Sequence, residues 1–99
     1  MMGFTLVGGR AHRVQGRPSA LFTYRGAGGI ALVCQMFEAR MTELSTPRES
    51  RTQNGVTFAI YQVGAATLVF WPEGSIVCVL ASTLDPERVI ALAVAKAQA

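Results

Sequence analysis

The sequence predicts an α+β domain: a mainly antiparallel sheet of about six strands, in two three-strand meanders, with one C-terminal helix packed on it. Three observations indicate this fold class. Short runs of β-branched and aromatic residues alternate with glycine or proline clusters, which is the pattern of β-hairpins. One polar segment divides these runs into two groups. The last part of the chain, after Asp85-Pro86, has a helical pattern.

Six apolar segments are expected to form strands because turn signals separate them. The turn signals lie at residues 15–18, 26–29, 64–65 and 72–74. The expected strands are residues 4–14, 19–25, 30–37, 56–63, 66–71 and 75–82.

The polar segment at about residues 39–54 differs from its surroundings. It is charged, contains Pro47 and lacks apolar periodicity. We expect a long loop here between the two strand groups, with one helical turn at residues 39–44. Loops of this length are uncommon inside a compact domain, so the segment is expected to be mobile or functional. Residues 1–99 are expected to form a single domain.

The C-terminal helix has the clearest start signal in the chain. Asp85 is a good N-cap, Pro86 suits the first helical position, and Glu87 places an acid in the first turn. The alanine-rich helix then runs on through residues 89–97. Its apolar residues cover more than half of its circumference, so we expect both the sheet and a further element to cover it.

Two hairpins resemble each other. Residues 20–24, followed by Ile30 and Cys34, are similar to residues 67–71, followed by Ile76 and Cys78. The spacing from isoleucine to cysteine differs, but both pairs stay on one face of a strand. A three-strand unit used twice and a chance similarity both remain open.

The composition predicts a globular chain with partners. It is 51% hydrophobic and only 15% charged, against about 25% charged in a typical domain. We therefore expect apolar surface to be hidden against a protein partner or a second copy. The basic residues are concentrated in the first half: residues 1–51 carry seven of them and three acids, a net +4 against −1 for the rest.

A basic first half is compatible with nucleic acid or anionic lipid, but arginines at alternate strand positions are also ordinary on a solvated face. No apolar run reaches the roughly 18 residues of a membrane helix, and the first residues lack the basic region of a signal peptide.

Neither the single histidine nor the glycines predict a site. His12 is expected in a strand without a carboxylate or cysteine nearby in the sequence, whereas a metal site or a catalytic triad needs several converging groups. Gly8-Gly9 and Gly16 precede strand-like runs instead of a helix, so no helix N-terminus supports a phosphate. For Gly8-Gly9 we expect a bulge or a close backbone approach.

The two cysteines are interpreted as core residues. Cys34 shares a strand face with Leu32 and Met36, and Cys78 shares one with Leu80. A disulfide would require neighbouring strands and an oxidising compartment. A catalytic thiol would need a basic group or helix N-terminus to lower its pKa, and neither lies nearby in the sequence.

The aromatic residues do not predict a nucleic-acid surface. Phe22, Phe58 and Phe70 are interpreted as core, while Tyr24 and Trp71 are placed at strand ends just before turns. No alternation of rings and arginines, as on an RNA-binding sheet, occurs. Nucleic acid is therefore a minor alternative.

From the residues alone we predict a binding or interaction module and not an enzyme, with no catalytic, cofactor-binding or metal-binding residue and no cofactor. Two alternatives stay open. One is a small-ligand module with a pocket between residues 85–97 and the sheet. The other is an enzyme that uses Cys34 or Cys78.

Two stretches resemble the extracytoplasmic portion of transmembrane anti-sigma factors. They are LVGGRAHRVQGRPSALFTYRGAGGIALV and FWPEGSIVCVLASTLDPERVIALA. The resemblance is carried by residues 6–10, 16–24, 71–74 and 84–87, and it covers most of the chain outside the polar loop. The family's cytoplasmic zinc-binding domain and membrane helix have no counterpart in the sequence.

This resemblance implies the outer half of a membrane-bound regulator of transcription. Such a domain would be periplasmic, and it would transmit an envelope signal through protein contacts, with a partner or with itself. The family's outer half supplies no catalytic residues to carry over. If the resemblance does not hold, a cytoplasmic location is expected.

Overall fold

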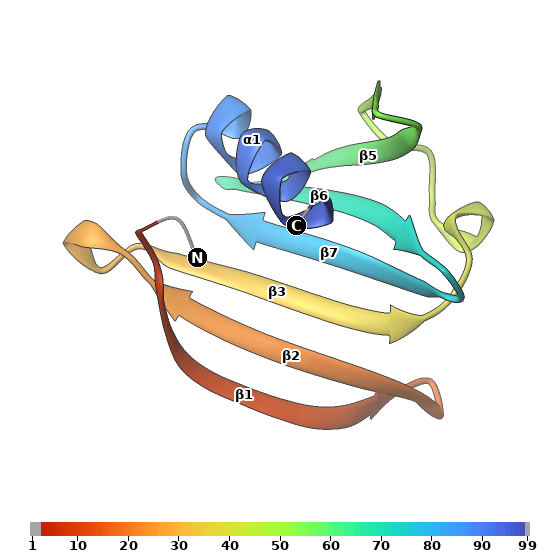
Figure 1. Ribbon diagram of the computed structural model, residues 1–99, viewed down its shortest axis with the longest axis horizontal. Helices are drawn as coiled ribbons and strands as arrows, with labels where there is room; N and C mark the ends of the chain where they lie inside the picture. The colour runs from red at the N-terminus through yellow and green to blue at the C-terminus, as the bar shows by residue number, and fades with distance from the viewer. Residues whose placement is uncertain (1–2, 99) are drawn as a thin grey trace.

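The computed structural model describes residues 3–98, which form one seven-stranded antiparallel sheet with a twelve-residue helix on one face (Figure 1). The strands are β1 Thr5–Val14, β2 Arg17–Arg25, β3 Ala31–Glu38, β4 Glu49–Gln53, β5 Val56–Val63, β6 Ala66–Glu73 and β7 Ile76–Ser82. Helix α1 is Pro86–Ala97, and two short 3-10 turns occupy Ala27–Gly29 and Met41–Glu43.

The strand order is β1-β2-β3-β7-β6-β5-β4, with every neighbouring pair antiparallel. The predicted α+β class and the C-terminal helix are confirmed. The predicted count of six strands is wrong, and so is the layout of two three-strand meanders. The first group has three strands and the second has four, and they join where β3 pairs with β7.

The β3–β7 pair has a symmetric register. Cys34 lies opposite Leu80, and Cys78 lies opposite Met36. Cys34 also lies opposite Phe22, whereas Cys78 lies opposite Trp71. If residues 20–24 correspond to residues 67–71, Phe22 matches Val69 and not Trp71, so the two cysteines do not occupy equivalent positions of a repeated unit.

The missed strand is β4, which lies inside the segment expected to be a loop. Its sequence, ESRTQ, has no apolar residue and so no hydrophobic pattern. The turn that follows fixes the strand: Asn54 and Gly55 have φ values of 51° and 80°, as a tight hairpin turn with an Asn-Gly pair requires. Thr52 and Thr57 then pair through their hydroxyls at 3.1 Å. The loop is thereby reduced to residues 39–48, with the expected helical turn at Met41–Glu43.

Helix α1 begins where the sequence predicts. Asp85 accepts a hydrogen bond from the backbone N–H of Glu87 at 3.2 Å, and Pro86 occupies the first turn. Val89 and Ala93 are fully buried against the sheet, over β6 and β7. Arg51 of β4 also reaches the start of the helix, donating to both carboxylate oxygens of Glu87 at 2.9 and 2.6 Å.

The bulge and the close backbone approach expected at Gly8-Gly9 are both confirmed. The β1–β2 register shifts between Leu6 and Gly8, which is a bulge. At Gly9 the ring of Phe22 lies so close that an added Cβ would be 3.0 Å from Phe22 Cδ1. These glycines therefore shape β1 and let a neighbouring ring pack on its backbone.

The core lies between α1 and the sheet. Its largest fully buried side chains are Trp71 and Phe58, whose ring centroids are 5.9 Å apart. Trp71 also donates its indole N–H to Glu73 at 2.8 Å, so this polar atom is satisfied in its buried position.

Candidate functional site

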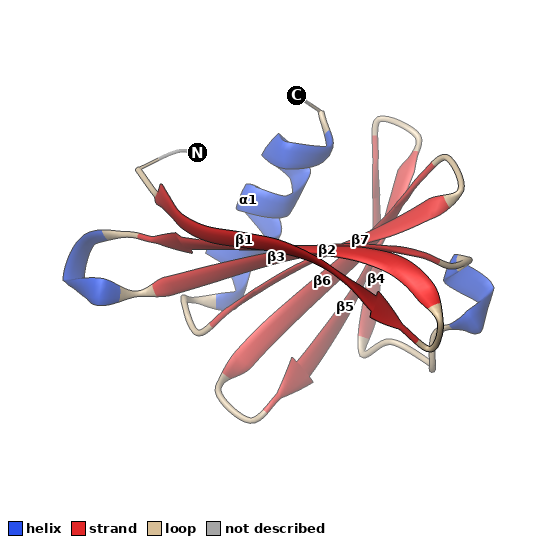
Figure 2. Ribbon diagram, turned by 90° about the horizontal axis from the view of Figure 1, so that it is seen from below, coloured by secondary structure: helices blue, strands red, loops and turns tan. Residues whose placement is uncertain are grey.

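The surface that distinguishes this domain is the sheet face turned away from α1, which we call the open face. Figure 2 shows α1 on one side of the twisted sheet and the two short turns at the strand ends. Two rows of directly opposed residues cross the open face from β2 to β5. They are Thr23, Val33, Ala81, Leu68 and Tyr61 in one row, and Leu21, Gln35, Val79, Phe70 and Ala59 in the other.

These rows are apolar although no helix of the described residues lies over them. Val79 and Ala59 are buried by their neighbours at 7% and 6% exposure, and the other members are half-buried. The polar members, Thr23, Gln35 and Tyr61, carry no charge. A sheet face in contact with water normally carries polar side chains, and strands that are apolar on both faces are normally covered on both.

The loop at residues 39–48 is held at one border of the open face. Tyr61 donates its hydroxyl to the carbonyl of Ser45, and its ring meets Phe70 edge to face at 5.2 Å between centroids. The backbone N–H of Arg48 donates to the carbonyl of Ile60 at 2.9 Å. The loop, for which mobility or a function is expected, thus makes definite contacts with β5.

Charged residues surround a shallow depression of about 800 Å³ beside this loop. Arg17 Nη1 lies 3.2 Å from Glu43 Oε2, and Glu43 also accepts from the backbone N–H of Arg40 at 3.0 Å. The bond from Arg40, followed by the one from Arg17, lowers the pKa of Glu43. The charges of Arg17 and Glu43 therefore satisfy each other, and the described residues gather no cluster of like charge around the depression.

The space between helix and sheet, where a ligand pocket was the alternative, is filled by side chains. Val89 and Ala93 of α1 are fully buried there, as are Phe58 and Trp71 of the sheet. A second depression, of about 250 Å³, is lined by residues that include Ser19 and Ile76, and none of its lining residues belongs to α1.

His12 is a half-buried residue of β1. Its Nδ1 is buried and makes no hydrogen bond to the described residues. Across residues 3–98 no group of three or more histidine, cysteine, aspartate or glutamate side chains is placed to hold a metal ion. The described part of the chain therefore brings no ligand or catalytic partner to His12.

The interpretation of both cysteines as core residues is confirmed. Cys34 and Cys78 are free thiols, 0% and 1% exposed, on the α1 side of the sheet. They lie diagonally across β3 and β7, not opposite each other. Diagonal neighbours are about 7–8 Å apart, beyond the usual Cα separation of bridged cysteines.

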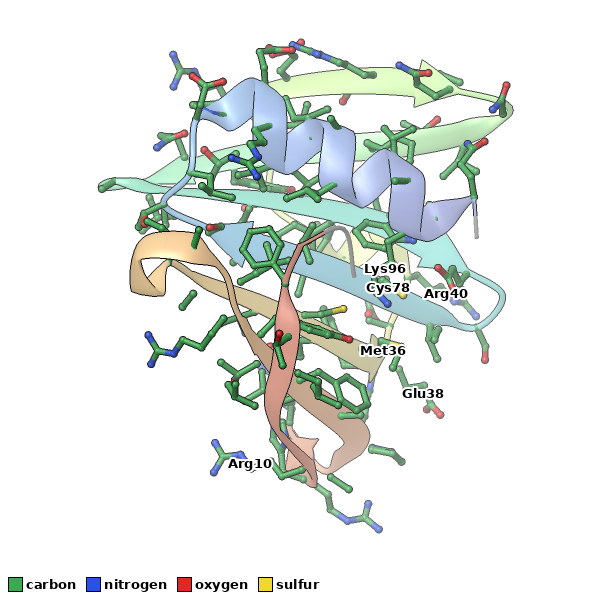
Figure 3. The ribbon with its side chains drawn as sticks, turned by 60° about the vertical axis from the view of Figure 1, so that its left-hand side comes forward. Arg10, Met36, Glu38, Arg40, Cys78 and Lys96 are labelled. Carbon is green, nitrogen blue, oxygen red and sulfur yellow. The ribbon has the colours of Figure 1, made fainter. Side chains whose placement is uncertain are left out.

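Burial controls the chemistry of these thiols. It raises the pKa of Cys34, and burial together with the nearby charge of Glu73 raises the pKa of Cys78 to about 12. Lys96, in the last turn of α1, lies near Cys78 (Figure 3) and acts in the opposite direction, but burial outweighs it. Both thiols are therefore protonated at neutral pH, which is the unreactive form.

The aromatic residues are distributed differently from the sequence-based expectation. Trp71 is expected from the sequence at a strand end, just before a turn. In the structure β6 continues to Glu73, and Trp71 is fully buried in the core. Phe58 is core as predicted. Phe70, expected in the core, lies on the open face with Tyr61. Consecutive strand residues point to opposite faces, so Phe70 and Trp71 cannot both face α1.

Sequence reasoning missed the open face as a surface, although a signal for it existed. The β7 sequence, IVCVLAS, is apolar at nearly every position, and β3, ALVCQMF, is similar. Neither strand alternates strictly between apolar and polar residues, as a strand with one wet face would. Continuous apolar runs of this kind indicate strands that are covered on both faces.

Comparisons with family models, curated proteins and solved structures give no match for this chain. Among the described residues, no helix is both long and apolar enough to cross a membrane.

Proposed function

We propose that this chain is a non-enzymatic regulatory domain that acts through protein contacts made by the open face. The observation that carries the proposal is that the open face is apolar across β2, β3, β7, β6 and β5 while α1 covers only the other side of the sheet. Covering such a face removes apolar area from water, which is the main favourable term in protein association.

A second copy of the chain is the proposed occupant of the open face. The two rows from β2 to β5 contain no charged side chain, and the charge that borders them is Arg10 of β1, opposite Leu21 at the end of one row. Two identical faces that overlap over β2–β5 can therefore approach without like charges meeting. Closed two-fold dimers place the same patch on both subunits, which suits a self-complementary apolar face.

The cellular class of the domain rests on the sequence resemblance. We propose the periplasmic part of a membrane-bound anti-sigma factor, in which pairing through the open face would transmit a signal across the membrane to transcription. The buried, protonated thiols of Cys34 and Cys78 and the paired charges of Arg17 and Glu43 support this regulatory function over catalysis.

Sedimentation equilibrium of wild type and two open-face variants tests the self-association. Val33→Glu and Leu68→Glu place a carboxylate in each variant at a half-buried position of the same row, which a monomer tolerates. We expect a wild-type dimer and at least about a hundredfold weaker association in either variant, because the carboxylate would be buried unpaired. Ala91→Glu, on the exposed side of α1, is the matched control and should leave the dimer intact. A monomeric wild type, or variants that still dimerise, would contradict the proposal.

The anti-sigma class has a separate test in the gene. We expect the reading frame upstream of Met1 to encode a zinc-binding domain followed by a membrane helix. A gene without them would exclude this class, and the dimer measured by sedimentation would be unaffected by that result.

A further inference from the structure

The outer edge of β1 is a second surface available for binding. β1 is ten residues long, pairs only with β2 among the described residues, and stands at the end of the sheet. Its backbone groups on the outer side therefore have no strand partner there. Leu6, Val7 and Val14 are 54%, 56% and 37% exposed, an unusual share of apolar side chains for an unprotected edge.

The charge of this edge has one sign. β1 itself carries two arginines, Arg10 and Arg13, and no aspartate or glutamate. Arg13 donates to the carbonyl of Gly16 in its own turn at 2.8 Å, and Arg10 makes no ion pair with the described residues. Figure 3 shows Arg10 at the far end of the molecule from α1. The edge thus presents positive charge without an internal counter-charge from the described residues.

The opposite edge differs in each of these respects. β4 has five residues and no apolar side chain. Its Arg51 is paired with Glu49 at 2.5 Å and with Glu87 of α1 at 2.6 Å. A short edge with satisfied charges is the usual protection against strand addition, and β1 lacks this protection.

A second copy of β1 fits this edge poorly. Pairing β1 with itself would add no carboxylate to either strand, so the charges of Arg10 and Arg13 of both chains would be left without a counter-charge. Registers that place these arginines opposite each other would be destabilised. A nucleic acid also fits poorly, because Arg10 and Arg13 lie on opposite faces of the ribbon. The ring of Phe22 packs under Gly9 and is not displayed for stacking.

We propose that the β1 edge is a docking site for an extended, acidic segment of a partner protein, which adds to the sheet as a further strand beside β1. Backbone hydrogen bonds along β1 would supply the affinity, as in other cases of strand addition. Carboxylates at alternating positions of the segment would face Arg10 on one side of the sheet, and apolar side chains would cover Leu6 on the other. This inference goes beyond the proposed self-association because it concerns a different surface.

Isothermal titration with synthetic peptides tests the proposal. The probe is a capped peptide as long as β1 in which glutamate alternates with valine. One control peptide has lysine in place of glutamate, and another is N-methylated at every second amide, which blocks strand pairing. We expect the acidic peptide to bind and both controls to fail. Binding of the N-methylated peptide with equal affinity, or no binding of the acidic peptide, would overturn the proposal.

Protein variants locate the site. Arg10→Glu should weaken binding of the acidic peptide about fivefold to tenfold, because an attraction is replaced by a repulsion. Arg88→Glu makes the same charge change at an exposed position of α1 and should leave the affinity unchanged. Equal weakening by both variants would indicate a general charge effect and overturn the proposal.

Two further measurements distinguish the β1 edge from the remaining surfaces of the domain and from a nucleic-acid site. In the Leu68→Glu variant, which removes the open-face contact, peptide binding should persist; its loss would place the peptide on the open face and contradict the proposal. In NMR spectra the amides of Thr5–Val14 should shift and gain protection from exchange when the peptide binds. If instead only a single-stranded oligonucleotide shifted these amides, the edge would be a nucleic-acid site and the proposal would be wrong.

Discussion

At the scale of single residues, three buried side chains of the core have their polar atom hydrogen-bonded. Trp71 donates to Glu73, two residues on in the same strand, and the buried Thr67 hydroxyl donates to Gln62 at 2.8 Å. The buried Ser82 hydroxyl donates to the carbonyl of Ala31 at 2.9 Å, which ties β7 to β3. Such bonds remove the cost of burying a polar group and help to fix one packing arrangement. The bond from Ser82 to Ala31 depends on β7 and β3 becoming neighbours, so the sequence alone does not predict it.

Gly26 is predicted to be irreplaceable for a steric reason. Its φ of −113° suits any residue, but a Cβ there would lie 2.7 Å from the buried ring of Phe4. Gly26→Ala should therefore expel this ring and lower the free energy of unfolding by about 1–3 kcal/mol. Gly8→Ala is the control, because a Cβ at Gly8 meets no atom within 4 Å; it should change the stability by less than about 0.5 kcal/mol. Urea unfolding measures both, and equal effects would refute the steric argument.

Cys78 should make the fold less stable at high pH. Its pKa is raised from 9.0 in the unfolded chain to about 12 by burial. The unfolded state therefore loses the thiol proton first, so the contribution is complete below pH 9 and is lost as the pH rises from 9 towards 12. Each such thiol steepens the fall in stability by at most about 1.4 kcal/mol per pH unit.

Urea unfolding at a series of pH values tests this linkage. Between about pH 9 and pH 10 the free energy of unfolding should fall more steeply for wild type than for Cys78→Ala, in which the other titrating groups are unchanged. Parallel pH profiles for the two proteins would show that the thiol does not titrate differently in the folded state.

At the scale of elements, local signals decide which segments form structure. The Asp-Pro-Glu start of α1 and the glycine irregularity in β1 were both readable because each is a local backbone requirement. β4 was overlooked because its residues carry no apolar pattern. Its one local signal was Asn54-Gly55, a favoured pair for two-residue hairpins, and weighing that pair above hydrophobicity would have found the strand.

The cap of α1 gives a prediction for this scale. Asp85→Ala removes the side-chain acceptor for the backbone N–H of Glu87 and should destabilise the fold by about 1 kcal/mol. Asp85→Asn keeps an acceptor at the same place and should retain most of the stability. Thermal unfolding followed by circular dichroism distinguishes them, and an Asn variant as unstable as the Ala variant would show that the charge matters more than the cap.

At the scale of the whole molecule, the sheet depends on one long-range junction. β1–β3 and β4–β7 are each built from neighbouring hairpins, but β3 and β7 are far apart in the sequence and still pair along their full lengths. This junction places the strands of Cys34 and Cys78 side by side, builds the continuous core under α1, and extends the open face across both halves. Nothing local in either strand specifies this pairing, since it is settled by the burial of both strands together.

Hydrogen exchange should follow the position of each strand in the sheet. We expect the slowest amides in β7, β6 and β5, which have partners on both sides and the most buried side chains. The outer amides of β1 and β4 should exchange fastest among the strands, because they lie at the two edges. Amides of β1 as slow as those of β7 in the monomeric Leu68→Glu variant, without added peptide, would contradict this gradient.

Local patterns in the sequence predict the α+β class, six of the seven strands, the start of the helix, and the core position of the cysteines. Each follows from periodicity, turn chemistry or capping, which act over a few residues. The three-dimensional fold is needed to see that β3 pairs with β7, that Phe70 faces away from α1, and that the described residues leave the open face and the β1 edge uncovered. The physical reason is that strand neighbours and layers are chosen by the burial of surfaces far apart in the chain, a cooperative property that short-range signals do not encode.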